Sequence, residues 1–179
     1  MGFREHFVAD YGFQAVLGHE IDAVTQDLGN GPVKGIVQCN LGMACEGLDR
    51  PQEARRFFRD ALDTARDVGD SRLEGQILGY LGLLHARQGE VELACECLVK
   101  GDALLRALDD RASLGILLCA RAEAEQLARQ TGLAQLALAE ARSVAAAIAA
   151  SSGSEFGLAL ERAEAAVNAG TVNAKEGDR

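Results

Sequence analysis

The feature that most constrains the fold of this 179-residue chain is an internal repeat of about 40 residues. Gly35-Ile36 is followed at equal offsets by Gly75-Gln76 and Gly115-Ile116, and Leu41-Gly42 matches Leu81-Gly82. A fixed period of roughly 20 to 50 residues is the signature of solenoids and other repeat proteins. We therefore expect stacked copies of one supersecondary unit, which bury a shared core.

Each repeat unit has the pattern of two helices. Ser71 and Glu74 have the spacing of a capping box, which predicts a helix start. Apolar residues then recur every three or four positions until Gly89, and glycine favours a helix end. In the preceding unit Asp49 is a candidate cap and Pro51 suits a first helical turn. The expected helices lie near 3–28, 33–47, 51–67, 71–88, 91–107, 111–130, 134–150 and 154–168.

Glycines inside the expected helices predict close helix packing. Gly42 and Gly82 lie mid-helix, where glycine costs about 1 kcal/mol relative to alanine, so a neighbouring helix must offset that cost. Ala54, Ala94 and Ala137 are expected at the facing positions.

The third unit is expected to depart from the other two. Its first helix looks about three residues longer, which puts Gly132, Leu136 and Ala137 in the places of Gly89, Leu93 and Ala94. The chain then forms one domain over 1–168, with repeats near 29–68, 69–108 and 109–150, an N-terminal helix at 3–28, a C-terminal helix at 154–168 and a flexible tail at 169–179.

Composition excludes several classes of function. The net charge is −9 and the basic residues are interleaved with acidic ones, which disfavours nucleic-acid binding. No stretch approaches the roughly 20 apolar residues of a membrane span, and the N-terminus lacks the order of a signal peptide. No nucleotide-binding glycine motif occurs, and neither the three histidines nor the five cysteines have ligand or catalytic spacing. We expect a soluble cytoplasmic protein with buried reduced thiols, no catalytic activity, no cofactor and no metal.

The repeat resembles the tetratricopeptide repeat. One unit carries the pattern with Leu41-Gly42, Cys45, Ala54 and Phe58, and the next with Leu81-Gly82, His85, Gly89, Ala94 and Leu98. The 40-residue period is most similar to the repeats of Pins-type spindle-orientation adaptors and of bacterial regulatory proteins, and an Ala- and Gly-rich composition is typical of GC-rich bacterial genomes. The resemblance implies an all-α, right-handed superhelix of antiparallel helix pairs.

The resemblance also implies a concave groove lined by the first helix of each unit, in which a protein or peptide partner binds. A chaperone-type carboxylate clamp is disfavoured, since Tyr80 and Ala120 stand where its polar residues belong. Tyr80 is the expected anchor, with Leu83 beside it and with Arg87 and Glu123 setting orientation. The implied partner-binding residues are Ile36, Cys39, Asn40, Met43, Gln76, Tyr80, Leu83, Arg87, Ile116, Cys119 and Glu123. The open alternative is that Ile36, Leu83 and Ile116 only complete packing between repeats.

The sequence also allows two other functions, self-assembly and the sensing of a small molecule. An N-terminal stripe of apolar residues has helical spacing, and we expect it either to cap the first repeat or to make a homodimer contact. It comprises Phe3, Phe7, Tyr11, Leu17, Ile21, Val24 and Leu28. The last helix, with Phe156, Leu160, Ala163 and Val167, is the other candidate for self-assembly. A small-molecule-sensing pocket is the second rival, although no titratable groups converge in the sequence. The chain could also be a piece of a longer regulator.

Overall fold

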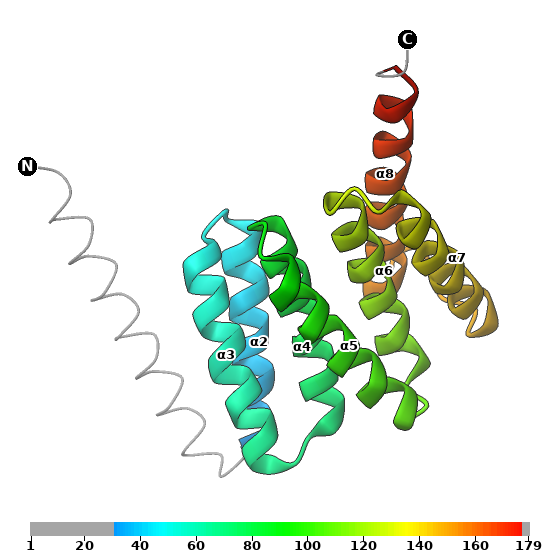
Figure 1. The fold of residues 1–179 in the computed structure, drawn as a ribbon. Coiled ribbons are helices and arrows are strands. Elements are labelled where there is room, and N and C mark those ends of the chain that lie inside the picture. The colour runs from blue at the N-terminus through cyan, green and yellow to red at the C-terminus, as the bar shows by residue number, and fades with distance from the viewer. Residues whose placement is uncertain (1–30, 177–179) are drawn as a thin grey trace, which may run out of the picture.

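Helices α2 to α7 start every 20 residues, at 31, 51, 71, 91, 111 and 131. The computed structural model describes residues 31–176, with side chains up to residue 170; the expected helix at 3–28 lies outside the described residues. The helices are α2 (Gly31–Gly47), α3 (Pro51–Val68), α4 (Ser71–Arg87), α5 (Val91–Ala107), α6 (Arg111–Leu127), α7 (Thr131–Ala147) and α8 (Glu155–Glu176). The described part of the chain is therefore an all-α repeat in which consecutive helices form antiparallel pairs (Figure 1).

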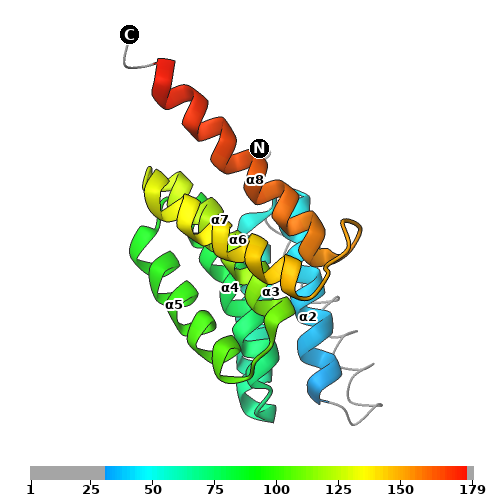
Figure 2. The ribbon, with the colours of Figure 1, turned by 90° about the vertical axis from the view of Figure 1, so that its right-hand side faces the viewer.

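The helices form two layers of different character. Among the described residues, α4, α6 and α8 pack side by side, whereas α3, α5 and α7 pack on the even-numbered helices and not on one another. Helix α2 packs mainly on α3 and touches α4 only marginally. Figure 2 shows α8 running along α6 and α7 at the C-terminal end of the array. We call the surface of α2, α4, α6 and α8 that faces away from the odd-numbered helices the inner face.

The mid-helix glycines are explained by close packing inside each helix pair. A Cβ atom on Gly42 would lie 2.6 Å from the ring of Phe58, and one on Gly82 would lie 2.6 Å from Leu98 Cγ. In the first two pairs, glycine on the first helix thus admits a large residue from the second. The close packing was predicted, but the side chains nearest the two glycines are Phe58 and Leu98 and not the expected Ala54 and Ala94. The core comprises two clusters, one from α2, α3 and α4 and one that extends from α4 to α8.

The third unit follows the same spacing as the others, and the expected three-residue extension is wrong. Helix α6 ends at Leu127 and α7 begins at Thr131. The turn residue with left-handed backbone is Arg129 (φ 59°), in the place of Gly89 (φ 76°). Glycine is the usual residue in this conformation, so Gly132 misled the prediction. The position equivalent to Ala54 and Ala94 is held by Ala134, which is fully buried.

The expected helix caps are also corrected. Asp70, not Ser71, precedes α4, and its side chain accepts a hydrogen bond from Leu73 N at 2.9 Å. Asp49 does not cap α3, because it adopts a left-handed backbone (φ 58°) in the turn and Arg50 takes the cap position. The carboxylate of Glu74 pairs instead with Arg66 Nε at 2.8 Å. The starts of α3 and α4 were predicted correctly, at 51 and 71, although the residues that take the cap positions are Arg50 and Asp70 and not Asp49 and Ser71.

The C-terminal helix is longer than expected. Helix α8 continues to Glu176 and includes most of the segment that was expected to be a flexible tail. Gly170 lies against Gln126 of α6, where a Cβ atom would overlap the amide group, so a glycine lets the two helices approach there. Phe156, Ala163 and Val167 are buried in the core of the same chain and Leu160 packs against it. They are therefore not available for docking on another copy.

Candidate interaction surface

The residues expected to line a concave groove divide into three groups. Ile36, Asn40 and Arg87 are exposed; Met43, Gln76, Tyr80 and Ile116 are half-buried. Cys39, Leu83, Cys119 and Glu123 are each less than a tenth exposed, which corrects their expected place on the surface. Leu83, Cys119 and Glu123 are buried because α4, α6 and α8 pack closely side by side, whereas Cys39 belongs to the core cluster of α2, α3 and α4. Helical periodicity does not distinguish these flanks from the open surface.

An aromatic pair separates α2 from α4. The rings of Phe58 and Tyr80 stack with their centroids 5.7 Å apart and their planes 12° apart. At the equivalent positions between α4 and α6, forty residues later, the chain has the smaller Leu98 and Ala120. Because the rings fill more space than leucine and alanine, they account for the marginal contact between α2 and α4. The inner face is therefore wide at its first junction, where the two rings lie between α2 and α4, and narrow at the second, where α4 and α6 pack directly on each other.

The first turn of α8 contributes to the inner face beside this pair. The hydroxyl of Tyr80 donates a hydrogen bond to Glu155 Oε1. Burial raises the pKa of Tyr80, and the bond to Glu155 raises it further, so the phenol stays protonated and donates; Arg162 has a smaller opposing effect. Tyr80 thus links α4 to α8.

A charged bridge crosses the same layer. The guanidinium of Arg87 on α4 pairs with Glu46 on α2 and donates from Nη2 to Glu123 Oε2 on α6 at 3.0 Å. Arg87 is partly exposed, whereas both carboxylates are mostly covered. Arg87 and Glu123, which were expected to orient a partner, are thus paired with each other inside the protein.

Among the described residues, the hollow beside Tyr80 is too small for a small molecule. The hollow lined by Gln76, Tyr80 and Ile116 has a volume of about 10 Å³. Small-molecule sites usually enclose roughly 300 to 1,000 Å³. Side chains of Gln76 and Ser113 close this junction with a hydrogen bond of 2.7 Å. The surface around Tyr80 is therefore shallow and suits contact with another polypeptide.

The thiols of this region are not reactive groups. Burial, with a smaller effect of Glu155, raises the pKa of Cys39 to about 12, and burial with Glu123 raises that of Cys119 to about 12. All five cysteines are free, and only Cys95 is exposed. Within residues 31–176 no three histidine, cysteine, aspartate or glutamate side chains are grouped to hold a metal ion. Among the described helices none has the length and apolarity to cross a membrane.

Sequence reasoning missed three residues that shape this surface. Phe58 was assigned to the second helix of its unit, and nothing in the pattern shows that its ring reaches Tyr80. Glu155 and Arg162 belong to α8, whose place beside α6 is set in part by the packing of Phe156 against Gly115. Phe156-Gly157 does follow the Gly115 motif in the sequence, and this was the available signal. Comparison with known proteins found no family model and no curated protein that matches the chain.

Proposed function

We propose that this protein is an interaction scaffold or adaptor that holds a peptide or helix of a protein partner on its inner face. The resemblance to the tetratricopeptide repeat favours this function, since stacked helix pairs of that kind provide extended binding surfaces. The shallow relief around Tyr80 also favours a polypeptide over a small molecule. We place the protein in a bacterial cytoplasm, because its five cysteines are unpaired as in reducing compartments.

The observation that carries the proposal is the row of exposed and half-buried residues that α2, α4 and α6 present on the inner face. Ile36 is 47% exposed on α2, while Asn40 and Met43 lie one and two turns further along the same helix. Tyr80 lies across the junction on α4, and Ile116 is half-buried on α6. A partner segment that lies across α2 and α4 would cover Ile36 and contact the half-buried ring of Tyr80, which stacks on the buried Phe58.

The test is affinity capture from a lysate with wild-type and substituted chains. Ile36→Glu places a charge on the inner face of α2 at a small cost in folding free energy, because the side chain is 47% exposed. Leu83 is unsuitable as a probe, since it is 7% exposed and a glutamate there would destabilise the fold. Leu48→Glu is the matched control, because Leu48 is an exposed apolar residue that follows the end of α2.

We expect a partner that the wild-type chain and the Leu48→Glu control both retain and that Ile36→Glu loses at least tenfold, which is a cost of about 1.4 kcal/mol. Circular dichroism of all three chains checks that the helices persist. Equal retention of every captured protein by the wild-type and Ile36→Glu chains would refute the inner-face assignment.

A further inference from the structure

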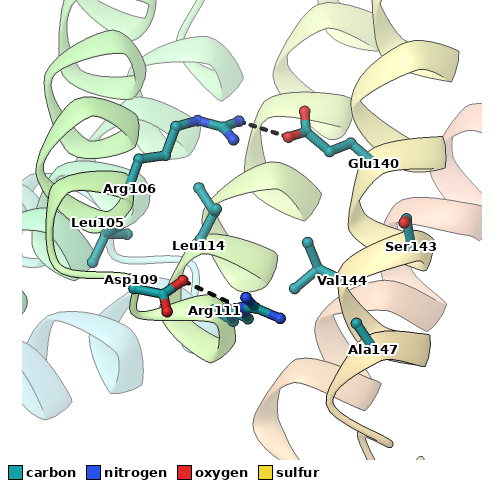
Figure 3. Close-up of a pocket in the computed structure, with 9 residues that line it drawn as sticks. All are labelled: Leu105, Arg106, Asp109, Arg111, Leu114, Glu140, Ser143, Val144 and Ala147. Carbon is teal, nitrogen blue, oxygen red and sulfur yellow. Dashed lines mark hydrogen bonds and ion pairs between the residues drawn. The ribbon is translucent and has the colours of Figure 1, made fainter.

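A second surface lies between α5 and α7, on the opposite side of the even-numbered layer. The two helices do not pack on each other, and α6 forms the floor between them. Figure 3 shows residues of α5 and α7 on either side of Leu114 from α6. Two hollows open along this surface, one of about 310 Å³ at the start of α5 and α7 and one of about 360 Å³ at their ends. We call this surface the outer groove.

Large apolar side chains are exposed on and beside the hollow of about 310 Å³. Its lining includes Val91, Leu127 and Leu133, which are 44%, 54% and 44% exposed. Val99 lies one turn after Cys95, a lining residue of α5, and Leu136 lies one turn after Leu133 on α7. Leu136 is 68% exposed, so most of its side chain projects into solvent. A cluster of this kind on a protein surface usually marks an interaction site.

The repeat itself shows that the fold does not require these apolar residues. Helix α3 occupies the same place in its unit as α5 and α7, at offsets of 40 and 80 residues. At the matching positions α3 has Arg59 where α5 has Val99, and it has Glu53 and Arg56 where α7 has Leu133 and Leu136. Since α3 packs on its neighbours with charged residues at these positions, the apolar residues of α5 and α7 have another role.

The distribution of charged residues around the outer groove indicates which kind of partner it fits. The charged residues of α5, α7 and the linings of the two hollows are Glu92, Glu96, Lys100, Asp102, Arg106, Asp109, Arg111, Arg121, Glu125, Glu140 and Arg142. Acidic and basic groups are nearly balanced in this set, while the whole chain carries −9. The guanidinium of Arg106 donates one hydrogen bond to Asp102 of α5 and one to Glu140 of α7, at 2.7 Å each, so these charges are already compensated. A face of balanced charge reduces the repulsion between two copies of a chain with this net charge.

We propose that the outer groove is the contact between two copies of this chain. A two-fold contact presents the same patch from both chains, so the patch must contain both a projecting group and a hollow to receive it. The outer groove has both, since Leu136 projects beside a hollow of about 310 Å³ lined by Val91, Leu98 and Leu133. In the dimer, Leu136 of each chain enters this hollow of the other. The inner face stays free, so the dimer presents two inner faces.

The test measures the mass of the full chain by sedimentation velocity over a wide range of concentration. We expect the wild-type mass to double as concentration rises. Leu136→Glu should weaken the dimer by at least about tenfold, because a carboxylate would enter an apolar hollow. Val99→Glu serves as a second variant. Leu48→Glu is the matched control, since Leu48 is also 68% exposed but lies at the end of α2, and it should leave the dimer unchanged.

Cys95 reports on the same surface independently. It is the exposed cysteine of the chain and lines the hollow of about 310 Å³. At concentrations where the wild-type chain is a dimer, the thiol of Cys95 should be alkylated at least several-fold more slowly than in dilute solution. In Leu136→Glu the rate at high concentration should return to the fast rate of the dilute chain. A monomeric mass at every concentration would overturn the proposal and leave the groove to a different partner. A dimer that keeps its affinity and its Cys95 protection in Leu136→Glu would overturn it as well. Neither result bears on the Ile36→Glu capture experiment, which probes the inner face.

Discussion

Six turn residues at 20-residue intervals adopt the left-handed backbone conformation, and only two of them are glycine. They are Asp49, Gly69, Gly89, Asp109, Arg129 and Ala149, with φ between 49° and 76°. Residues other than glycine pay roughly 1 to 2 kcal/mol in this conformation. Helix packing therefore maintains the 20-residue spacing of the turns, even where the residue at the turn disfavours the left-handed conformation.

Exchanging residues between these turns tests that account. Arg129→Gly should raise the free energy of unfolding by about 1 kcal/mol, because glycine adopts the left-handed conformation without strain. Gly89→Ala should lower it by a similar amount through the backbone alone, since a Cβ atom there meets no atom within 4 Å. Urea denaturation of both variants measures the changes. A loss of stability in Arg129→Gly would show that the arginine side chain, and not the turn, determines the energy at this position.

At the scale of the helices, α4 and α5 approach each other closely at Gly75 and Gly101. A Cβ atom on Gly101 would lie 2.9 Å from the carbonyl oxygen of Gly75 and 2.6 Å from Leu117 Cδ1. Gly101→Ala should destabilise the protein by about 1 to 3 kcal/mol, because a backbone atom cannot move aside as a side chain can. Gly132→Ala is the control, since it has open space around it and should be neutral or stabilising by up to about 1 kcal/mol. Thermal unfolding distinguishes them, and equal effects would contradict the close approach.

The junction of α3, α4 and α5 is sensitive to acid. Glu90, before α5, accepts a hydrogen bond from Arg55 Nη2 at 2.8 Å and is bonded to the ring of His85. Arg55 first and His85 second lower the pKa of Glu90 to about 2. The unfolded value is about 4.3, so this stabilisation is complete above pH ~4.3 and is lost as the pH falls toward ~2.

Replacing the carboxyl group tests this dependence. Glu90→Gln should unfold at a lower temperature than wild type near neutral pH and should lose less stability between pH ~4.3 and ~2. The effect is small, since the group is solvent-accessible. Glu92→Gln, on the first turn of the same helix, controls for the loss of one charge. If the melting temperatures of wild type and Glu90→Gln fell by the same amount across this range of pH, the account would be contradicted.

The element pattern could be predicted from the sequence because the repeat shows the same helix pair three times. Apolar spacing located α4 and α5 within one residue at either end. The α6–α7 boundary was misplaced by three residues, because Arg129 takes a conformation that sequence reasoning reserves for glycine. The tail was misjudged because its polar composition does not show that Gly170 allows α8 to continue along α6.

The candidate surface was harder to predict than the fold. A helical pattern shows that Leu83 and Cys119 share a side with Tyr80, but not that neighbouring even-numbered helices cover them. Only the three-dimensional packing shows that the rings of Phe58 and Tyr80 lie between α2 and α4, while α4 and α6 pack directly on each other beside Leu98 and Ala120. The contribution of Glu155 has the same origin, since it comes from a helix 75 residues away from Tyr80 in the sequence.

At the scale of the whole molecule, the two surfaces have different tasks. We propose that the inner face holds a protein partner and that the outer groove holds a second copy. The two lie on opposite layers of one array, so one contact does not block the other. A dimer of this kind would bind two partner molecules at once, which raises the apparent affinity for a multivalent target.

The most direct measurement of this central claim is site-specific photo-crosslinking in living cells. A photoreactive side chain replaces either Ile36 on the inner face or Leu136 beside the outer groove, and the products are identified by mass spectrometry. We predict that position 36 crosslinks to a different protein and that position 136 crosslinks to a second copy of this chain. Partner protein at position 136 with none at position 36 would contradict the assignment of the inner face.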